Sequence, residues 1–156
     1  MATRITKKAM HAQAFLNEPI EYQKSFSRGL RVDLNGVAIL YISGTASINE
    51  KGQTHCPGDF PAQVKRTFEN LTALIRSEKA TWDDVVFTRC YLKDMKHYQE
   101  FNEFRNMFYK KLKLNTFPAS VCVEAGLCRP ELLVEIEATV MLKINKKNKE
   151  DFKRTG

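Results

Sequence analysis

The sequence predicts an α+β domain in which two helices lie on one face of a single mixed β-sheet. Two stretches repeat apolar residues at steps of three and four, as helices do, and five stretches are rich in strand-forming residues. Their order is strand, strand, helix, strand, helix, strand, strand. No repeat or linker interrupts the chain, so we expect one domain over residues 25–144, an irregular extension over 1–24 and a basic, flexible tail over 145–156.

The first two expected strands, Ser25–Asp33 and Val37–Ser43, are separated by a short turn sequence. Asn35 and Gly36 lie in this turn, and an Asn-Gly pair favours the left-handed backbone that a tight hairpin needs. We therefore expect the two strands to pair in antiparallel fashion.

The first helix is expected to begin near residue 60, after a loop that contains Gly52 and Gly58. The Asp59 side chain can accept hydrogen bonds from the free N–H groups of a first turn. Pro61 is tolerated in that turn because the N–H group that proline lacks would have no partner within the helix. The following apolar residues repeat at helical steps, so this face is expected to be buried: Phe60, Val64, Phe68, Leu71 and Ile75.

A third strand is expected over Val85–Leu92, and Asp94 then starts a second helix that extends to about Leu112. The last two strands are expected over Ala119–Glu124 and Leu132–Ile144. Two helices can cover only one face of the resulting sheet, and the other face would expose apolar side chains, which predicts a homo-oligomer. The apolar stripe of the second helix is expected to be core rather than a cofactor site: Tyr98, Phe101, Phe104, Phe108 and Leu112.

The net charge of +7 and the pI near 9.3 favour contact with acidic partners. Much of the positive charge lies at the chain ends, however, and Phe152 is the only aromatic residue interleaved with the basic tail. A solvated terminus explains this charge better than an arm that stacks on bases, so nucleic acid ranks below a small molecule as the expected partner.

The spacing of cysteines and histidines predicts neither a metal site nor a disulfide framework. The four cysteines form no Cys-x-x-Cys pair, and none of the three histidines lies at ligand spacing from them. We therefore expect reduced thiols, no metal and no cofactor. The N-terminus has no apolar core of signal-peptide length, and no apolar run approaches the ~20 residues of a membrane span. A cytoplasmic protein without membrane contact is expected.

The strongest indication of a site lies in the last expected strand. Glu135 and Glu137 interrupt a run of apolar residues, and a carboxylate in such a run is costly unless it faces a polar cleft, a partner or a ligand. Both point to one face of the strand, because strand side chains alternate. Glu124 on the preceding strand is a third candidate, and each of the three can instead be a structural partner of a basic group.

Short motifs follow one another through residues 25–144: Tyr41-Ile42-Ser43-Gly44-Thr45, Gly58-Asp59-Phe60-Pro61-Ala62-Gln63, Phe68-Glu69-Asn70-Leu71, Val85–Asp94, Phe101-Asn102, Phe117-Pro118-Ala119 and Val134–Ala138. In this order and spacing they resemble the Rid family of RidA-like proteins, which is also called the YjgF family and known as well by the name L-PSP endoribonuclease. The resemblance implies a chorismate-mutase-like fold that assembles as a homotrimer, with the sheets in a central barrel and ligand clefts at the subunit interfaces. It also implies hydrolysis of reactive enamines and imines, released by pyridoxal-phosphate enzymes, to a 2-keto acid and ammonia.

The resemblance further implies which residues form the site. Glu135 matches a glutamate that orients or activates the attacking water, and Ser43 with Gly44 matches a serine that lies against the ligand. Phe26 takes the place of a tyrosine and leaves only an apolar wall, while Cys122 matches a cleft cysteine.

One position departs from the family pattern. In the best-known members an arginine directly after the Pro-Ala pair forms a bidentate salt bridge with the substrate carboxylate, and this chain has Ser120 there. A hydroxyl gives one neutral hydrogen bond in place of two charged ones, so the affinity for a carboxylate falls by several kcal/mol. A standard 2-iminoacid deaminase is therefore not expected. Arg129 and Arg28 are the candidates for replacing the missing charge.

Three classes of function stay open. The first is a hydrolase for an imine-like or related reactive metabolite, in which Glu135 positions water, and the second is a non-catalytic ligand sensor that uses the same cleft. RNA binding or cleavage, as in a translation inhibitor, ranks last because no pair of histidines is placed for acid-base cleavage. Two structural alternatives also stay open: the Ser43 hydroxyl can bond to backbone, and Cys122 can be a small buried hydrophobe.

Overall fold

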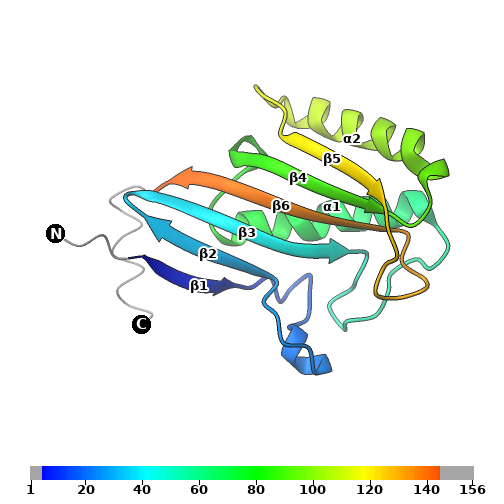
Figure 1. Ribbon diagram of the computed structural model, residues 1–156, viewed down its shortest axis with the longest axis horizontal. Helices are drawn as coiled ribbons and strands as arrows, with labels where there is room; N and C mark the ends of the chain where they lie inside the picture. Colours follow the sequence, from blue (N-terminus) through cyan, green and yellow to red (C-terminus); the bar gives the residue numbers. More distant parts are fainter. Residues whose placement is uncertain (1–4, 145–156) are drawn as a thin grey trace.

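A computed structural model describes residues 5–144 and confirms the α+β class (Figure 1). Its helices are α1 (Phe60–Ser77) and α2 (Tyr98–Leu112), and its shorter 3-10 turns are η1 (Pro19–Tyr22), η2 (Trp82–Asp84) and η3 (Met95–His97). Its strands are β1 (Thr6–Met10), β2 (Gly29–Leu34), β3 (Val37–Ala46), β4 (Val85–Leu92), β5 (Ala119–Glu124) and β6 (Val134–Lys143).

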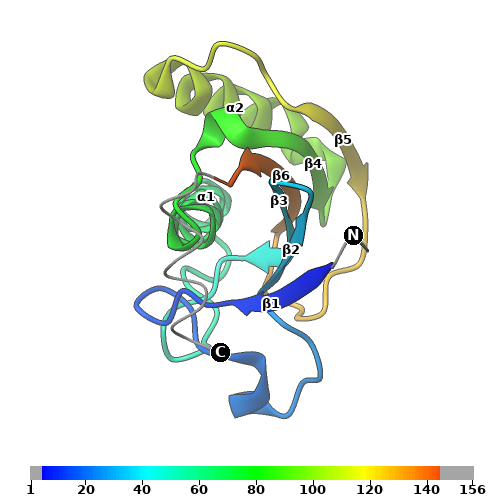
Figure 2. The ribbon, with the colours of Figure 1, turned by 90° about the vertical axis from the view of Figure 1, so that its left-hand side faces the viewer.

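The six strands form one mixed sheet in the order β1-β2-β3-β6-β4-β5. All neighbours are antiparallel except β4 and β5, which run parallel. Figure 2 shows α1 and α2 on the same side of this sheet, as expected. We call the opposite side, which carries no helix of the described chain, the open face.

The expected hairpin between β2 and β3 is confirmed. Leu34 pairs with Val37 across the turn, and Asn35 and Gly36 have φ angles of 51° and 83°. Both angles lie in the left-handed region, which Asn and Gly adopt more readily than other residues. The turn chemistry therefore sets the register of these two strands.

The irregular extension expected over residues 1–24 is wrong for residues 6–10, which form β1 and pair with β2. Lys7 and Lys8 lie on this edge strand in contact with solvent, so the sequence there lacks the apolar alternation of a central strand. Met10 is buried opposite Gly29, where a Cβ would lie 2.8 Å from the Met10 sulfur. The expected basic tail over 145–156 lies outside the described residues.

The first helix begins as its sequence predicts. The Asp59 carboxylate accepts a hydrogen bond from the Ala62 N–H at 3.0 Å, and Pro61 lies in the first turn. This capping leaves the apolar face free to pack on the sheet. All of its expected residues are buried: Phe60, Val64, Phe68, Leu71 and Ile75.

The apolar stripe of the second helix is buried only in its middle. Phe101 is buried, and Phe104 and Phe108 pack against the core, but Tyr98 and Leu112 are 39% and 37% exposed. The helix covers the edge of the sheet near β4 and β5 (Figure 2), so the two ends of its stripe reach solvent. The expectation of a core position is therefore wrong for these two end residues.

The strand before the hairpin is shorter than expected, because β2 begins at Gly29 and not at Ser25. Arg28 turns inward and is buried: its Nε donates to the Asn17 backbone oxygen at 2.9 Å and its Nη2 to the Asn17 side-chain oxygen at 3.0 Å. Residues 25–28 therefore form a separate segment beside the end of β3, which becomes one wall of the site.

The open face is rich in exposed apolar side chains. Tyr41 and Met141 are 51% and 45% exposed, and Val121 and Val123 on β5 are 43% and 41% exposed. Such a face agrees with the expected oligomer, whose trimeric state stays a prediction. None of the helices formed by residues 5–144 is long and apolar enough to cross a membrane.

Candidate functional site

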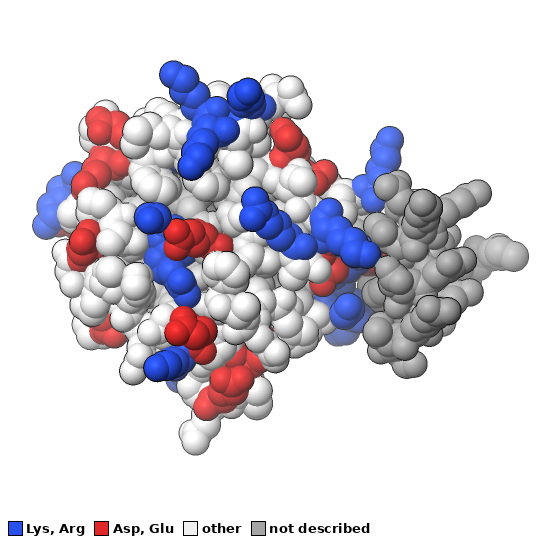
Figure 3. Space-filling view, turned by 180° about the vertical axis from the view of Figure 1, so that it is seen from behind, with Lys and Arg blue, Asp and Glu red and all other residues white. Residues whose placement is uncertain are grey.

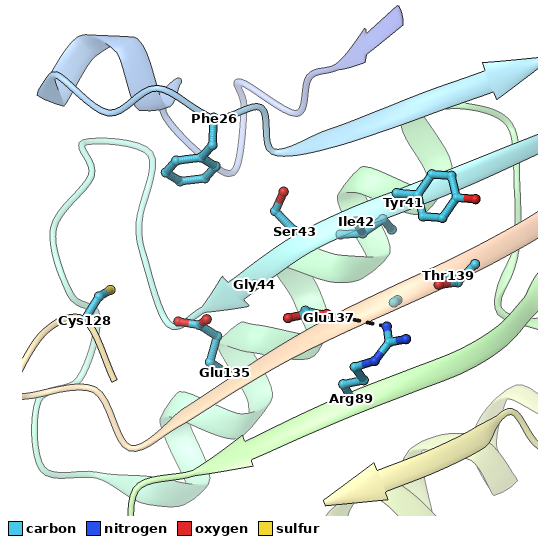
Figure 4. Close-up of a pocket in the computed structure, with 11 residues that line it drawn as sticks. Phe26, Tyr41, Ile42, Ser43, Gly44, Arg89, Cys128, Glu135, Glu137 and Thr139 are labelled. Carbon is cyan, nitrogen blue, oxygen red and sulfur yellow. Dashed lines mark ion pairs between the residues drawn. The ribbon is translucent and has the colours of Figure 1, made fainter. Parts of the chain in front are cut away.

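A cleft of about 560 Å³ lies on the open face, where β3 and β6 run side by side and the segment before β2 forms a wall (Figure 4). It is lined by Phe26, Tyr41, Ile42, Ser43, Gly44, Arg89, Cys128, Glu135, Glu137, Ala138 and Thr139. The structure thus brings together four of the residues expected at a ligand cleft: Phe26, Ser43, Gly44 and Glu135.

Glu135 is one of the two carboxylates that line this cleft. Its side chain extends from β6 toward Gly44 (Figure 4) and is partly buried, and it forms no hydrogen bond or ion pair with any residue in the described range. Burial, and then the nearby negative charge of Glu137, raise the pKa of Glu135 above its ordinary value. A carboxylate with a raised pKa can accept and return a proton near neutral pH.

Gly44 makes room for that carboxylate. The pairing of β3 with β6 is irregular between Ile42 and Thr45, so Gly44 lies at a bulge. A Cβ at Gly44 would lie 2.9 Å from Cδ of Glu135, closer than non-bonded carbon atoms approach. Glycine at this position therefore allows the strand to approach the carboxylate.

The Gly44→Ala variant is expected to displace the Glu135 carboxylate rather than to unfold the protein, because a flexible side chain can move aside. Misplacement of a reacting group predicts at least about a tenfold loss of turnover in the cleft. Steady-state kinetics measure the loss, and thermal denaturation checks that the fold is retained. Gly126→Ala is the matched control, since a Cβ there meets no atom within 4 Å. Equal losses in the two variants would contradict the role of Gly44.

One wall of the cleft combines a hydroxyl with an aromatic ring. Ser43 Oγ donates to the Ser27 backbone oxygen at 2.7 Å. The proton of this hydroxyl is therefore used in a bond to backbone, which is one of the two alternatives for Ser43. The same oxygen can still accept a hydrogen bond from a ligand. Phe26 is 45% exposed and lies edge to face with Tyr22, with ring centroids 6.5 Å apart. It supplies apolar surface only.

The second carboxylate of β6 has partners within the chain. Glu137 accepts a hydrogen bond from the Tyr91 hydroxyl at 3.0 Å and lies 3.5 Å from Nη1 of Arg89. The register of β4 and β6 places Arg89 directly opposite Glu137, which brings into the cleft a cation that the sequence did not indicate. Strand alternation alone indicates the face of Arg89, but only the β4–β6 pairing reveals its neighbour. The partners of Glu137 therefore lie within the protomer, which favours a structural role for this carboxylate.

The third acidic candidate, Glu124, lies outside the cleft. Its Oε2 accepts a hydrogen bond from the Met95 N–H at 2.9 Å, which stabilises the start of η3. Of the three carboxylates singled out in the sequence, only Glu135 is left without a partner in the described chain.

Ser120 and Cys122 lie on the helix side of β5, opposite the open face. Ser120 Oγ accepts hydrogen bonds from Thr88 Oγ1 and from Nη1 of Arg105, each at 3.1 Å. Cys122 packs against the core, and burial followed by the proximity of Cys90 raises the pKa of its thiol to about 11. The packing of Cys122 against the core and the raised pKa of its thiol favour the interpretation of Cys122 as a small buried hydrophobe. A role of Ser120 and Cys122 in binding requires a cleft completed by another protomer and stays a prediction.

Arg129 and Arg28, the two arginines considered from the sequence as cleft cations, both have hydrogen-bond partners elsewhere in the protomer. Arg129 Nη1 donates to the Gly52 backbone oxygen at 2.8 Å, and Arg28 is held by Asn17 and lies over the Phe26 ring at 5.8 Å. Neither arginine lines the cleft.

A third guanidinium, which the sequence did not indicate, lies beside Ser120. Arg105 belongs to α2, and its contact with Ser120 Oγ joins the helix to β5. No sequence motif links these two positions, because the contact arises only when α2 packs next to the edge of the sheet (Figure 2). The fold therefore places a positive charge next to Ser120.

Residues 5–144 contain no group of three or more His, Cys, Asp or Glu side chains arranged to hold a metal ion. The four cysteines are free thiols, and Cys128 is an exposed one at the edge of the cleft. The chemistry available in the cleft of one protomer is therefore that of two carboxylates, several hydroxyls, a thiol and a guanidinium.

Comparison with known proteins places this geometry in a wider group. A family model described as endoribonuclease L-PSP matches residues 18–142. The YjgF gene product of E. coli has a similar structure, with 25% sequence identity and a TM-score of 0.70 over 85% of this chain and 97% of that chain. The Rid family protein YyfA from Yersinia pestis has 23% identity and a TM-score of 0.72, covering 88% and 100%. E. coli TdcF with bound serine has 20% identity and a TM-score of 0.72, covering 87% and 99%.

Proposed function

This chain belongs to the endoribonuclease L-PSP family, which includes the YjgF and Rid proteins, and on that premise we propose that it is a hydrolase for imine-like or enamine-like reactive metabolites. The observation that carries the proposal is the Glu135 carboxylate, which is partly buried in a cleft, has a raised pKa and lacks a partner within the described residues. Such a group is suited to activating water.

The proposed reaction uses Glu135 as a base and as an acid in each of two steps. The carboxylate takes a proton from water as the water oxygen attacks the C=N carbon, and gives that proton to the imine nitrogen, which forms a carbinolamine. It then takes the proton of the new hydroxyl and gives it to the nitrogen as the C–N bond breaks. The products are a carbonyl compound and ammonia. The Ser43 oxygen, which can accept one more hydrogen bond, is placed to orient the N–H of the substrate.

We place this activity in a cytoplasmic homotrimer with one cleft at each subunit interface. The exposed apolar side chains of the open face support burial against another copy of the chain, since a face of this kind is unfavourable in water. A cleft of about 560 Å³ accommodates a ligand of amino-acid size. The structure of TdcF with bound serine supports a ligand of this size in the family.

The rate of imine hydrolysis is expected to rise with pH through the raised pKa of Glu135, because only the ionised carboxylate accepts a proton from water. The inflection should lie above the ordinary glutamate pKa of 4.5. The test measures the pH dependence of kcat/KM for 2-aminoacrylate, generated in place, and for an imine without a carboxylate. Hydrolysis that does not change with pH in this range would contradict the role of Glu135.

Two alternative functions, a ligand sensor and an RNA-binding protein, can be distinguished from the proposed hydrolase by experiment. A protein that binds the imine or keto product but does not accelerate its hydrolysis is a sensor. Binding of RNA would weaken steeply as salt concentration rises. On the side of the molecule that carries the helices, lysines and arginines are interspersed with acidic residues rather than gathered in one stripe (Figure 3), which does not favour RNA.

A further inference from the structure

The guanidinium of Arg105 has no carboxylate partner among the described residues. It projects from α2 and is held in place by its neighbours: Nη2 donates to the Asn102 side-chain oxygen at 2.7 Å, and Cζ lies 5.4 Å from the centroid of the Phe101 ring. Its Nη1 donates to Ser120 Oγ at 3.1 Å. Arg105 is therefore a positioned positive charge that has no acidic side chain as partner within residues 5–144.

Ser120 extends this site. Its oxygen accepts hydrogen bonds from both Arg105 and Thr88, so its own hydroxyl proton is directed elsewhere. Within the described chain, its other polar neighbour is the sulfur of Cys90 at 4.0 Å, which is a weak acceptor. The hydroxyl proton of Ser120 and the remaining N–H groups of Arg105 are thus available to the same incoming acceptor.

We propose that Arg105, together with Ser120, anchors an anionic ligand, and that this ligand carries a carboxylate. A guanidinium presents two parallel N–H donors that match the two oxygens of a carboxylate, and one positive charge balances its single negative charge. Arg105 then supplies from a helix the charge that the serine on β5 does not supply.

The anchor belongs to the same site as Glu135 only if two protomers share that site, so this inference rests on the proposed function. Arg105 and Ser120 lie on the helix side of β5, whereas Glu135 lies on the open face of β6. Within one protomer, the sheet therefore separates the two groups. Because β5 is an edge strand of the sheet, it can meet the open face of a neighbouring copy in a closed ring.

The first test measures binding of pyruvate and of its neutral amide, pyruvamide, by isothermal titration calorimetry. Arg105→Ala is expected to weaken pyruvate binding about 10- to 100-fold while leaving pyruvamide binding nearly unchanged. Arg105→Lys keeps the positive charge but loses the two parallel donors of the guanidinium. Its affinity for pyruvate should lie between those of the wild type and Arg105→Ala. Arg76→Ala is the matched control, since Arg76 is an exposed arginine on α1, and it should bind pyruvate as the wild type does. Equal pyruvate affinity in the wild type and Arg105→Ala would overturn the proposal.

The second test mixes the variants Glu135→Gln and Arg105→Ala by co-expression with different tags, and measures hydrolysis at a low substrate concentration, where weak binding by Arg105→Ala leaves it nearly inactive. If one protomer contributes Glu135 and its neighbour Arg105, each mixed trimer regains one intact site, and about a quarter of the wild-type activity returns. No recovery would overturn the shared site. If the wild type binds pyruvate through Arg105 but hydrolyses no imine, the anchor stands and the proposed hydrolysis fails. If it hydrolyses imines equally well without Arg105, the hydrolysis stands and the anchor fails.

Discussion

Replacement of Glu135 by glutamine is expected to lower kcat for imine hydrolysis by about 100- to 10,000-fold, the range typical of a lost general base. Glutamine keeps the shape of the side chain but cannot take a proton from water. The measurement is the release of ammonia under saturating substrate, with binding of the keto product determined separately. We expect binding to change little, because the lost interaction is one of proton transfer.

The same variant should fold at least as well as the wild type. A carboxyl group whose pKa is raised in the folded state opposes folding once the pH exceeds its ordinary value, because the folded state then loses a proton less readily than the unfolded chain. Removing that group removes the penalty, so the melting temperature at neutral pH should stay equal or rise. A variant that is both inactive and strongly destabilised would point to a structural role for Glu135 instead.

Glu137→Gln is the comparison within the same strand. Glu137 accepts a hydrogen bond from Tyr91 and lies near Arg89, so its charge is already used within the protomer. We expect a smaller loss of activity than for Glu135→Gln. If the two variants lose equal activity, the assignment of the base to Glu135 alone is wrong.

The site residues predicted from the sequence have two sources: strand alternation indicates the acidic pair of β6, and the resemblance to the family indicates Phe26, Ser43 and Gly44. Alternation along β6 places Glu135 and Glu137 on one face, and this needs no knowledge of the neighbouring strands. The sequence does not predict Arg89 and Arg105, because their importance comes from the strand opposite Glu137 and from a helix that packs near Ser120. Contacts between elements far apart in the chain leave no local pattern.

In the fold too, features set by neighbouring residues can be predicted from the sequence, whereas features set by distant elements cannot. The Asn35-Gly36 turn and the Asp59 cap are local signals with a direct physical cause, and both are confirmed. The edge strand β1 cannot be predicted from its own residues, because its exposed lysines show no apolar alternation and its pairing with β2 determines its structure. Local chemistry therefore predicts turns and caps, whereas edge strands depend on their partners.

Replacement of Met141 by lysine is expected to dissociate the proposed trimer. Met141 is 45% exposed on the open face and pairs with Ile39, which in turn pairs with Val32, so it lies in an apolar row across the sheet. A lysine there stays solvated in a free protomer but would be buried without a partner in the assembly, which costs several kcal/mol for each copy. Light scattering coupled to size-exclusion chromatography should show a monomer, and imine hydrolysis should be lost with it.

Met107→Lys provides the control for that experiment, because Met107 is 65% exposed on α2, on the opposite side of the sheet. The chemical change is the same, but the residue lies outside the proposed interface, so mass and activity should match the wild type. Circular dichroism should show both variants folded, since neither side chain is buried in the protomer. If Met141→Lys keeps the mass and activity of the wild type, the open face is not the surface that joins the protomers, and a cleft shared between Glu135 and Arg105 is excluded with it.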